Sequence, residues 1–502
     1  MASALSFQHG DGYHEVHKSL PRWGRNFRSE YTKLQEQYPL TAGRSHSFLE
    51  NRTMPRLQQF QTVIPVIVFL VLGFGSLGRV HGQVAEPAKP QWFKGNLHTH
   101  SLWSDGNDFP EMICDWYKSH GYHFLALSDH NILSQGEKWV AADAGAKRDA
   151  IGGLERYLER FGKEWVQTRE KDGKQEVRLK TLEEFRPRFE ERGKFLLLQA
   201  EEVTDSFGSL PIHINASNIR EVIKPQGGKS VRETMSKNFI AIAAQSQRLG
   251  QPILAHLNHP NFGYGVTAED MAAVLEEHFF EVYNGHPSVN HQGDKTHAGT
   301  ERMWDVANTI RIGELKSPPL QGLATDDSHN YFGNRGASPG RGWVMVRSKQ
   351  LGPESLIRAL EAGDFYASSG VELADIRYSE AEGSLQINIT AEKDVVYVTE
   401  FIGTLVGYDA KSQPVLDKDG KEIVATRTYS ADVGKVLATV EGNEPSYKFT
   451  GKELYVRAVI TASVAPENPS FDGQKKQAWT QPVGWQKHLP KPVISDPAAA
   501  VK

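Results

Sequence analysis

Two histidines and an aspartate stand at short spacing in the segment NLHTHSLWSDG, residues 96–106. In an extended strand, residues i and i+2 face the same side, so His98 and His100 present two imidazoles to one side. Asp105 follows in a turn with Gly106, where its carboxylate could reach a second ion. Imidazole and carboxylate ligands without thiolate suit Zn, Mn or Fe. The segment therefore predicts a site for divalent metal ions.

Further imidazoles and carboxylates close other short apolar runs along the chain. These runs are HFLALSDH (123–130), KFLLLQAEE (194–202), PILAHLNHP (252–260), FFEVYNGHP (279–287) and LQGLATDDSH (320–329), and the segment PIHIN adds a further histidine. The candidate ligands that they supply are Asp129, His130, Glu201, Glu202, His213, His259, Asp327 and His329. A single histidine at a strand end is more often a hydrogen-bonded structural residue than a ligand. Six such segments converging on one place would form a charge cluster that needs cations to neutralise it.

The elements that must position these side chains alternate between two patterns. The short apolar runs predict strands, and the stretches 110–121 and 268–279 between them have helical periodicity. Alternating strands and helices predict parallel βαβ units. Ligands grouped at strand ends are typical of a (β/α) barrel, whose active site lies at the C-terminal face of its strands.

Two regions depart from this alternation. Residues 134–194 form an insertion rich in charge, with helical patterns at 152–165 and 181–192 around the turn KDGK. Such an insertion is either a substrate wall or lid or a solvated excursion. From about residue 375, alternating and β-branched runs separated by Gly, Asp, Asn and Pro turns predict a small antiparallel β-sandwich.

Length and composition set the outer limits. The 502 residues, 39% of them hydrophobic, exceed what one core usually holds, so two folded domains are expected. The formal net charge of -4 gives no overall field toward nucleic acid or anionic lipid, so no binding to nucleic-acid duplexes is expected. Cys114 is the only cysteine, which excludes an intramolecular disulfide and a cysteine-built zinc site.

The N-terminal segment predicts export. TVIPVIVFLVLGFGSL (62–77) follows Arg56 and precedes small residues, which is typical of a secretory signal peptide; an uncleaved membrane anchor is the alternative. Met54 stands where such a peptide would begin. The expected organisation is an untranslated or disordered extension (1–53), a signal peptide (54–83), a linker (84–91), a metallohydrolase barrel (92–374), a β-sandwich (375–490) and a disordered tail (491–502). The folded part is expected to be periplasmic or extracellular.

The motifs, in their order along the chain, resemble those of the polymerase and histidinol phosphatase (PHP) superfamily, particularly its stand-alone phosphoesterases. The resemblance covers residues 92–370 and implies an α/β fold, a distorted (β/α)7 TIM-like barrel, with two or three divalent metal ions (Zn, Mn or Fe). It implies His98, His100, Glu202 and Asp327 for the first metal, Asp105, His130 and His329 for the second, and a bridging Glu202 with His213 and His259 for the third. The family pattern favours Glu202 over Glu201, Asp327 over Asp326, and His259 over His256. The long insertion departs from the family's usual compactness.

The function expected from these residues is hydrolysis of phosphate esters, of phosphomonoester or nucleotide type, by attack of metal-bound hydroxide. Asp129, His256 or His286 is expected to protonate the leaving group, and Arg335 or Arg341 to clamp phosphate. The expected partner is a small phosphorylated substrate, with membrane association only if the signal segment stays uncleaved. Two alternatives stay open. One is an amidohydrolase-like enzyme, although no strand-end lysine stands out; the other is a non-catalytic, metal-stabilised binding protein.

Overall fold

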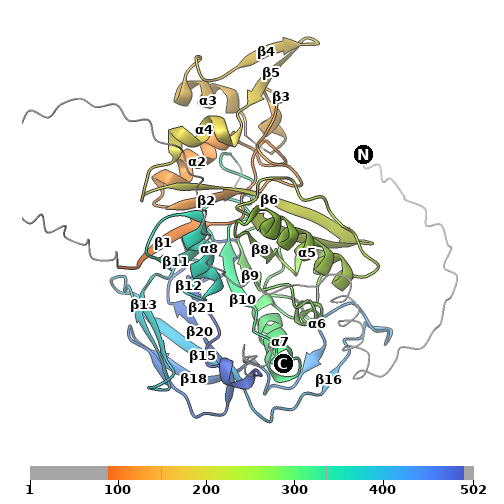
Figure 1. The fold of residues 1–502 in the computed structure, drawn as a ribbon, viewed down its shortest axis with the longest axis vertical. Helices are drawn as coiled ribbons and strands as arrows, with labels where there is room; N and C mark the ends of the chain where they lie inside the picture. Colours follow the sequence, from red (N-terminus) through yellow and green to blue (C-terminus); the bar gives the residue numbers. More distant parts are fainter. Residues whose placement is uncertain (1–88, 149, 334–335, 491–502) are drawn as a thin grey trace, which may run out of the picture. The chain divides into compact units, whose positions relative to one another are not determined.

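Seven strands form the part of the sheet that carries the candidate ligands. The computed structural model describes residues 89–490 except 149 and 334–335. The strands lie side by side in the order β10-β9-β8-β7-β6-β2-β1 (Figure 1). Their bounds are β1 Gln91–Asn96, β2 Phe124–Leu127, β6 Leu196–Phe207, β7 Leu210–Ser217, β8 Leu254–Leu257, β9 Phe279–Asn284 and β10 Gln321–Thr325. Each apolar run singled out in the sequence therefore forms a strand of this one sheet.

The strand directions are mixed, which corrects the expectation of uniform βαβ units. β1, β2 and β6 are parallel to one another, and so are β8, β9 and β10. Between them β7 runs antiparallel to both β6 and β8. The reason is a two-residue turn between Phe207 and Leu210, in which Gly208 adopts a φ of 62°, a conformation that glycine takes without steric cost. β6 and β7 thus form a hairpin where a helical crossover was expected.

Helices connect most of the remaining strands. They are α2 Pro110–Ser119, α5 Val231–Leu249, α6 Ala268–Ala273, α7 Thr300–Gly313 and α8 Pro353–Glu361. α2 begins with proline at its first turn, where the missing N–H costs nothing. α6 begins with a capping box between Thr267 and Asp270. It ends at Ala273 and is shorter than the helical pattern at 268–279, because Val274 takes an extended backbone conformation.

The segments that follow β1 and β10 contact each other. The backbone N–H of His100 donates to the carbonyl of Ser328 at 3.0 Å, and Thr99 and Ser328 form an isolated parallel bridge. Beyond β1 the same sheet continues as β11-β12-β21-β20-β15-β18 and reaches 13 strands. The bounds of these strands are Trp343–Ser348, Phe365–Ser368, Gln477–Thr480, Glu453–Ala462, Tyr397–Leu405 and Lys435–Glu441. The fold is therefore mixed α/β.

The C-terminal β region has two layers, as the sequence predicts. A second sheet of β13 (Leu373–Ser379), β14 (Ser384–Ile389) and β19 (Ser446–Lys448) shares a core with the large sheet. That core includes Leu385, Ile387, Tyr397, Phe401 and Val456. One layer of this region thus belongs to the same sheet as the ligand-bearing strands. Residues 84–502 cluster as one compact unit, and the domain boundary at residue 375 stays a prediction.

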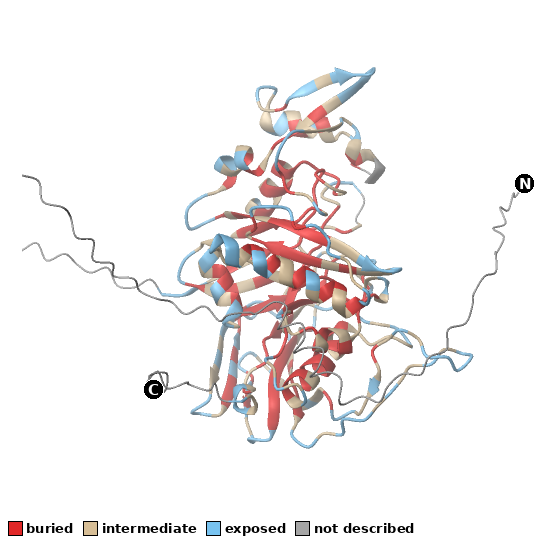
Figure 2. Cartoon of the chain, turned by 45° about the vertical axis from the view of Figure 1, so that its right-hand side comes forward, coloured by how far each residue is buried: buried red, intermediate tan, exposed pale blue. Residues whose placement is uncertain are grey.

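The insertion holds strands as well as helices. α3 (Gly153–Phe161) and α4 (Leu182–Phe189) lie within the two helical patterns. The insertion also contains β3 (Lys138–Ala141), which precedes α3, and β4 (Thr168–Lys171) and β5 (Lys174–Leu179), which lie between the two helices. These strands form an antiparallel sheet in the order β3-β5-β4. The prediction of a helical insertion is therefore incomplete, because the insertion also contains a small sheet. Its strands are largely exposed, whereas the central strands are buried (Figure 2).

The predicted extension, signal peptide and C-terminal tail lie outside the described residues, as does most of the linker. Among the helices that the structure describes, none has both the length and the apolar character needed to span a membrane.

Asp305 of α7 makes the main polar contact between the helical layer and the C-terminal strands. Its carboxylate accepts from Arg457 Nε at 2.8 Å, Arg457 Nη2 at 2.7 Å and the Tyr455 hydroxyl at 2.8 Å, and these side chains are buried.

Asp305→Ala leaves a buried guanidinium unpaired, so we expect about 3–5 kcal/mol of lost stability in urea unfolding. Glu354→Ala, which removes an exposed partner of Arg358, should cost about 0–1 kcal/mol. Equal losses of unfolding free energy in the two variants would show that the contact between Asp305 and Arg457 does not stabilise the fold.

Candidate metal centre

The structure brings all nine expected metal ligands into one cluster. His98 and His100 follow β1, and His130 follows β2. Glu202 lies in β6 and His213 in β7. His259 follows β8, and Asp327 and His329 follow β10. Asp105 comes from the loop after β1. These residues form overlapping groups whose nitrogen and oxygen atoms lie within 4.8 Å of one another. Six separate segments therefore converge at one end of the sheet.

Four side chains form a compact cage at the centre of this cluster. His98 Nε2 lies 3.1 Å from His100 Nε2, and each lies 3.2 Å from Asp327 Oδ1. Glu202 Oε2 lies 3.5 Å from His98 Nε2 and 3.3 Å from His100 Nε2. Tetrahedral ligands at 2.0–2.2 Å from an ion would be separated by about 3.3–3.6 Å. The five separations, 3.1–3.5 Å, lie near or just below these edges, so the donor atoms have the spacing of ligands around a small divalent cation.

Glu202 faces two sides of the cluster with its two oxygens. Oε1 accepts from Asn258 Nδ2 at 2.8 Å and lies 2.9 Å from His213 Nδ1 and 3.4 Å from His259 Nε2. Oε2 is directed to the cage and lies 2.9 Å from His130 Nδ1, without a hydrogen bond of normal geometry. A carboxylate placed in this way can bridge two ions, which is the role that the resemblance implies.

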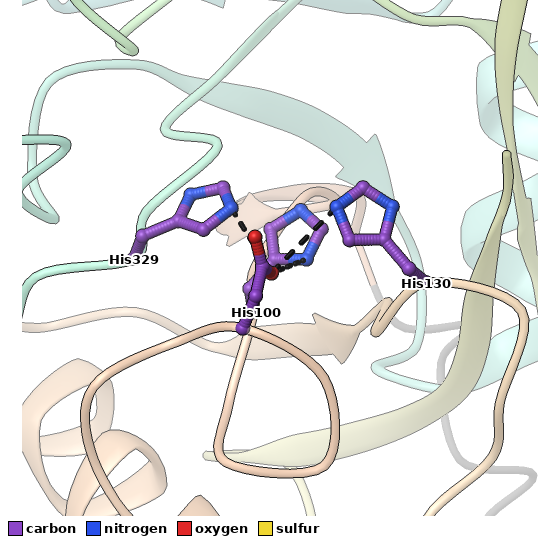
Figure 3. A group of neighbouring side chains, drawn as sticks. His100, His130 and His329 are labelled. Atoms are coloured by element: carbon purple, nitrogen blue, oxygen red, sulfur yellow. Dashed lines mark ion pairs between the residues drawn. The ribbon is translucent and has the colours of Figure 1, made fainter. Parts of the chain in front are cut away.

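A second group surrounds Asp105. Its Oδ1 lies 3.3 Å from His329 Nε2, 3.4 Å from His100 Nδ1 and 3.6 Å from His130 Nε2. Figure 3 shows the three imidazoles converging. The rings of His100 and His329 stack with centroids 4.0 Å apart. His100 thus faces the cage with one nitrogen and this group with the other.

The third expected set is divided in the structure. His213 groups with His130 and Glu202, whereas His259 groups with His98 and Asp327. Both histidines still face Glu202 Oε1. His213 comes from the reversed strand β7, opposite Thr204, and not from the end of a parallel strand, because the β6–β7 hairpin carries it back across the site.

The carboxylates of the cage favour positive charge on its two histidines. Burial disfavours the protonated ring of His98, yet the carboxylates of Asp327, Glu281 and Glu202 outweigh burial and hold its pKa well above the usual value. Burial also disfavours the protonated ring of His100, but the hydrogen bonds that this ring donates to the carboxylates of Asp327 and Glu202 raise its pKa to about 10. Cations would replace these protons, since metal ligands must be deprotonated. Metal affinity should therefore rise with pH.

Glu281 is a functional residue that the sequence reasoning missed. Its Oε1 lies 2.7 Å from His98 Nδ1, on the side of the ring opposite the cage, and accepts from Thr325 Oγ1 at 2.8 Å. Its Oε2 accepts from the His259 N–H and from Asn284 Nδ2, each at 2.8 Å. A carboxylate behind a metal-binding histidine fixes the ring's tautomer and orientation. The available signal was a glutamate inside the otherwise apolar run FFEVY.

Glu281→Gln is expected to weaken metal binding about 10- to 100-fold. The amide keeps the size of the side chain but removes the charge that orients the ring of His98. Competition with a chelator of known affinity measures the effect. Glu276→Gln, three residues before the start of β9 and outside the cluster, is the control and should bind metal normally. Equal affinity of the Glu281 variant and the unmodified protein would show that this positioning role is absent.

Neighbours of the ligands have structural partners. Asp129 accepts from the backbone N–H and hydroxyl of both Ser101 and Ser104, at 2.6–3.0 Å. It therefore supports the loop that carries His100 and Asp105. Glu201 points away from the cluster and accepts from the Ile223 N–H.

Asp326 has the same structural character. Its carboxylate accepts from the backbone N–H groups of Gly340, Arg341 and Gly342 and from the Tyr117 hydroxyl. These contacts leave Asp327, not Asp326, to face the histidines.

The remaining candidates for proton transfer and phosphate binding are placed as follows. His256 is fully buried, 3.4 Å from Glu281, and burial lowers its pKa. Burial also lowers the pKa of His286 to about 4, and its ring lies edge-on to His329 at 5.3 Å. Arg341 donates to the carbonyls of Gly285 and Gly336, so these bonds tie its guanidinium to the protein. Arg335 lies outside the described residues.

No protein-family model matches the sequence, and no curated protein matches it significantly. Two of the solved structures that are similar to this chain are described as metal-dependent phosphoesterases or as containing one. One is a two-domain protein from Bacteroides vulgatus containing a predicted PHP-like metal-dependent phosphoesterase, with 14% identity, 78% of this chain and 96% of that chain covered, and a TM-score of 0.33. Another, from Bifidobacterium adolescentis, is described as a metal-dependent phosphoesterase, with 12% identity, 48% and 90% coverage, and a TM-score of 0.24. At these TM-scores neither likeness carries weight for the chemistry of this chain, which rests on the site's own geometry.

Proposed function

We propose that this protein is a metal-dependent phosphoesterase of the PHP type, with two or three divalent ions held by the nine clustered residues. The observation that carries the proposal is the cage of His98, His100, Glu202 and Asp327, whose separations suit a tetrahedral cation. The ligands are nitrogen and oxygen only, which suits Zn, Mn or Fe.

Bound ions of this kind lower the pKa of water and stabilise negative charge on phosphate oxygens. The chain's own residues determine where a substrate enters. The side chains of His98 and His100 are fully buried, whereas those of Asp105 and His130 are 37% and 28% exposed. A phosphate group would therefore approach from the Asp105 side, and the buried cage would anchor the site.

The neutral ring of His286 lies beside His329 on this approach. In our proposal the ring of His286 forms a hydrogen bond with the substrate. The sequence singled out Asp129 and His256 for proton transfer, but in our proposal neither has that role. Asp129 supports the loop that carries the ligands, and His256 lies in the interior beside Glu281.

The finer features of the fold and location are part of the same proposal. The bridge between Thr99 and Ser328 supports a distorted seven-stranded barrel built from the strands β1 to β10 that carry the ligands. The apolar segment at 62–77 supports export to the periplasm or the extracellular space.

Three assays on protein loaded with manganese or zinc test the function. We expect release of phosphate from a generic phosphomonoester or cleavage of a phosphodiester, and no cleavage of an amide. Cleavage of the amide alone would favour the amidohydrolase alternative. Full metal occupancy without turnover of any of the three would favour a binding protein.

A further inference from the structure

A second cavity, of about 600 Å³, lies apart from the metal cluster. Its walls come from β1, α2, the loop before β11 and the C-terminal β region, and none of the nine candidate ligands lines it. Cavities of this size commonly bind small molecules. The side chains that determine its chemistry are Lys94, Trp116, Tyr122, Trp343, Glu372 and Glu467.

Lys94 supplies a positive charge flanked by two aromatic rings. Its Nζ lies 4.3 Å from the ring centroid of Tyr122 and 4.0 Å from that of Trp343. Within the described part of the chain, this ammonium makes no hydrogen bond or ion pair. Cation–π contacts stabilise the charge but leave its N–H donors unsatisfied. A ligand oxygen that accepts from Nζ would satisfy them.

The same cavity also carries acceptors. Glu372 and Glu467 are exposed carboxylates, and neither forms an ion pair with another described residue. Lys476 is paired with Glu392 at 2.8 Å and contributes no net charge. The cavity thus offers both a hydrogen-bond donor and hydrogen-bond acceptors.

Trp116 adds a flat apolar surface. Its ring is half-buried and stacks on His120 with centroids 3.9 Å apart and an interplanar angle of 12°. Two glycines keep the walls open. A Cβ at Gly340, whose φ is 86°, would lie 3.1 Å from the Trp116 ring, and one at Gly370, whose φ is 137°, would collide with Lys476.

We infer that this cavity binds a neutral saccharide. Sugar hydroxyls both donate and accept hydrogen bonds, so one ring can accept from Lys94 and donate to Glu372 and Glu467. The apolar face of the sugar ring matches the flat surface of Trp116. A simple anion would meet the two carboxylates, and a simple cation would meet Lys94, so an uncharged polar ligand suits this arrangement best.

The site is preformed by the fold. The N–H groups of Gly340 and Gly342 donate to Asp326 at 2.9 and 2.8 Å, which fixes the loop that leads to Trp343. Little reorganisation is needed on binding, which lowers its cost.

Calorimetric titration of the full chain with glucose, galactose, N-acetylglucosamine and cellobiose tests the inference, with glycylglycine and acetate as the competing ligand classes. We expect at least one sugar to bind with roughly millimolar affinity. Lys94→Met and Trp116→Ala should each weaken that binding at least tenfold, whereas Trp139→Ala, on β3 outside the cavity, should not change it. Thermal melting establishes that the variants are folded, and saturation-transfer NMR on the sugar gives a second readout.

Three results would overturn the inference: no sugar binding at tens of millimolar, sugar binding that both cavity variants retain, or binding of glycylglycine or acetate alone. None of these measurements depends on phosphoesterase activity, so the saccharide site and the proposed reaction can fail separately.

Discussion

Glu202→Gln should reduce phosphate-ester turnover by on the order of 10³-fold or more and lower the metal content, while Glu201→Gln leaves both near normal. The two glutamates are adjacent, buried and chemically identical. Only Glu202 places both oxygens among the histidines, whereas Glu201 bonds to the Ile223 N–H on the other side of β6. Turnover kinetics and elemental analysis of both variants measure the difference.

Glu201→Gln has its own signature in stability, which checks that it is a fair control. Burial raises the pKa of Glu201 from 4.5 to about 7. The folded state therefore holds this proton longer than the unfolded state, and that stabilisation is lost as pH rises from about 4.5 through about 7. The amide cannot ionise, so the variant should be more stable than the unmodified protein at pH 8, by on the order of 3 kcal/mol. If Glu201→Gln lost activity as completely as Glu202→Gln, the assignment of Glu202 as the ligand in β6 would be refuted.

Two substitutions in the cage should have effects of similar size. His98→Ala and Asp327→Ala each remove one corner of the cage and leave the remaining charges unbalanced. We expect both variants to lose metal and to show turnover reduced by on the order of 10³-fold or more. Steady-state kinetics with a generic phosphomonoester, together with metal content, gives the readout.

His488→Ala and Asp115→Ala are the matched controls, because His488 bonds to a carbonyl in the C-terminal region and Asp115 pairs with Arg160 on the surface. Both should keep full activity. Full activity in either cage variant would be incompatible with the site.

Most of the candidate ligands could be found from sequence because they close short apolar runs. A strand that ends in His or Asp at a sheet edge needs only local information, and His98, His130 and Asp327 were identified in this way. Glu281 was not, because it lies inside a strand that reads as apolar, and its value comes from contacts with His98 and His259 that only the folded chain creates.

The topology was harder to predict than the site. The β6–β7 hairpin depends on one two-residue turn at Gly208, and the continuation of the large sheet depends on pairing between β12 and β21, which are more than a hundred residues apart. Local periodicity carries no information on such partners. The roles of Asp129 and Asp326 could not be predicted from the sequence either, because the groups that donate hydrogen bonds to them, such as the N–H of Ser101 and the N–H of Gly340, belong to other segments of the chain.

Elemental analysis of the purified protein, combined with anomalous scattering from crystals at the absorption edge of the metal found, tests the central claim most directly. We predict two or three divalent ions per chain, one of them between His98, His100, Glu202 and Asp327. A well-folded protein that stays metal-free after incubation with zinc and manganese, or ions bound only away from these four side chains, would contradict the account.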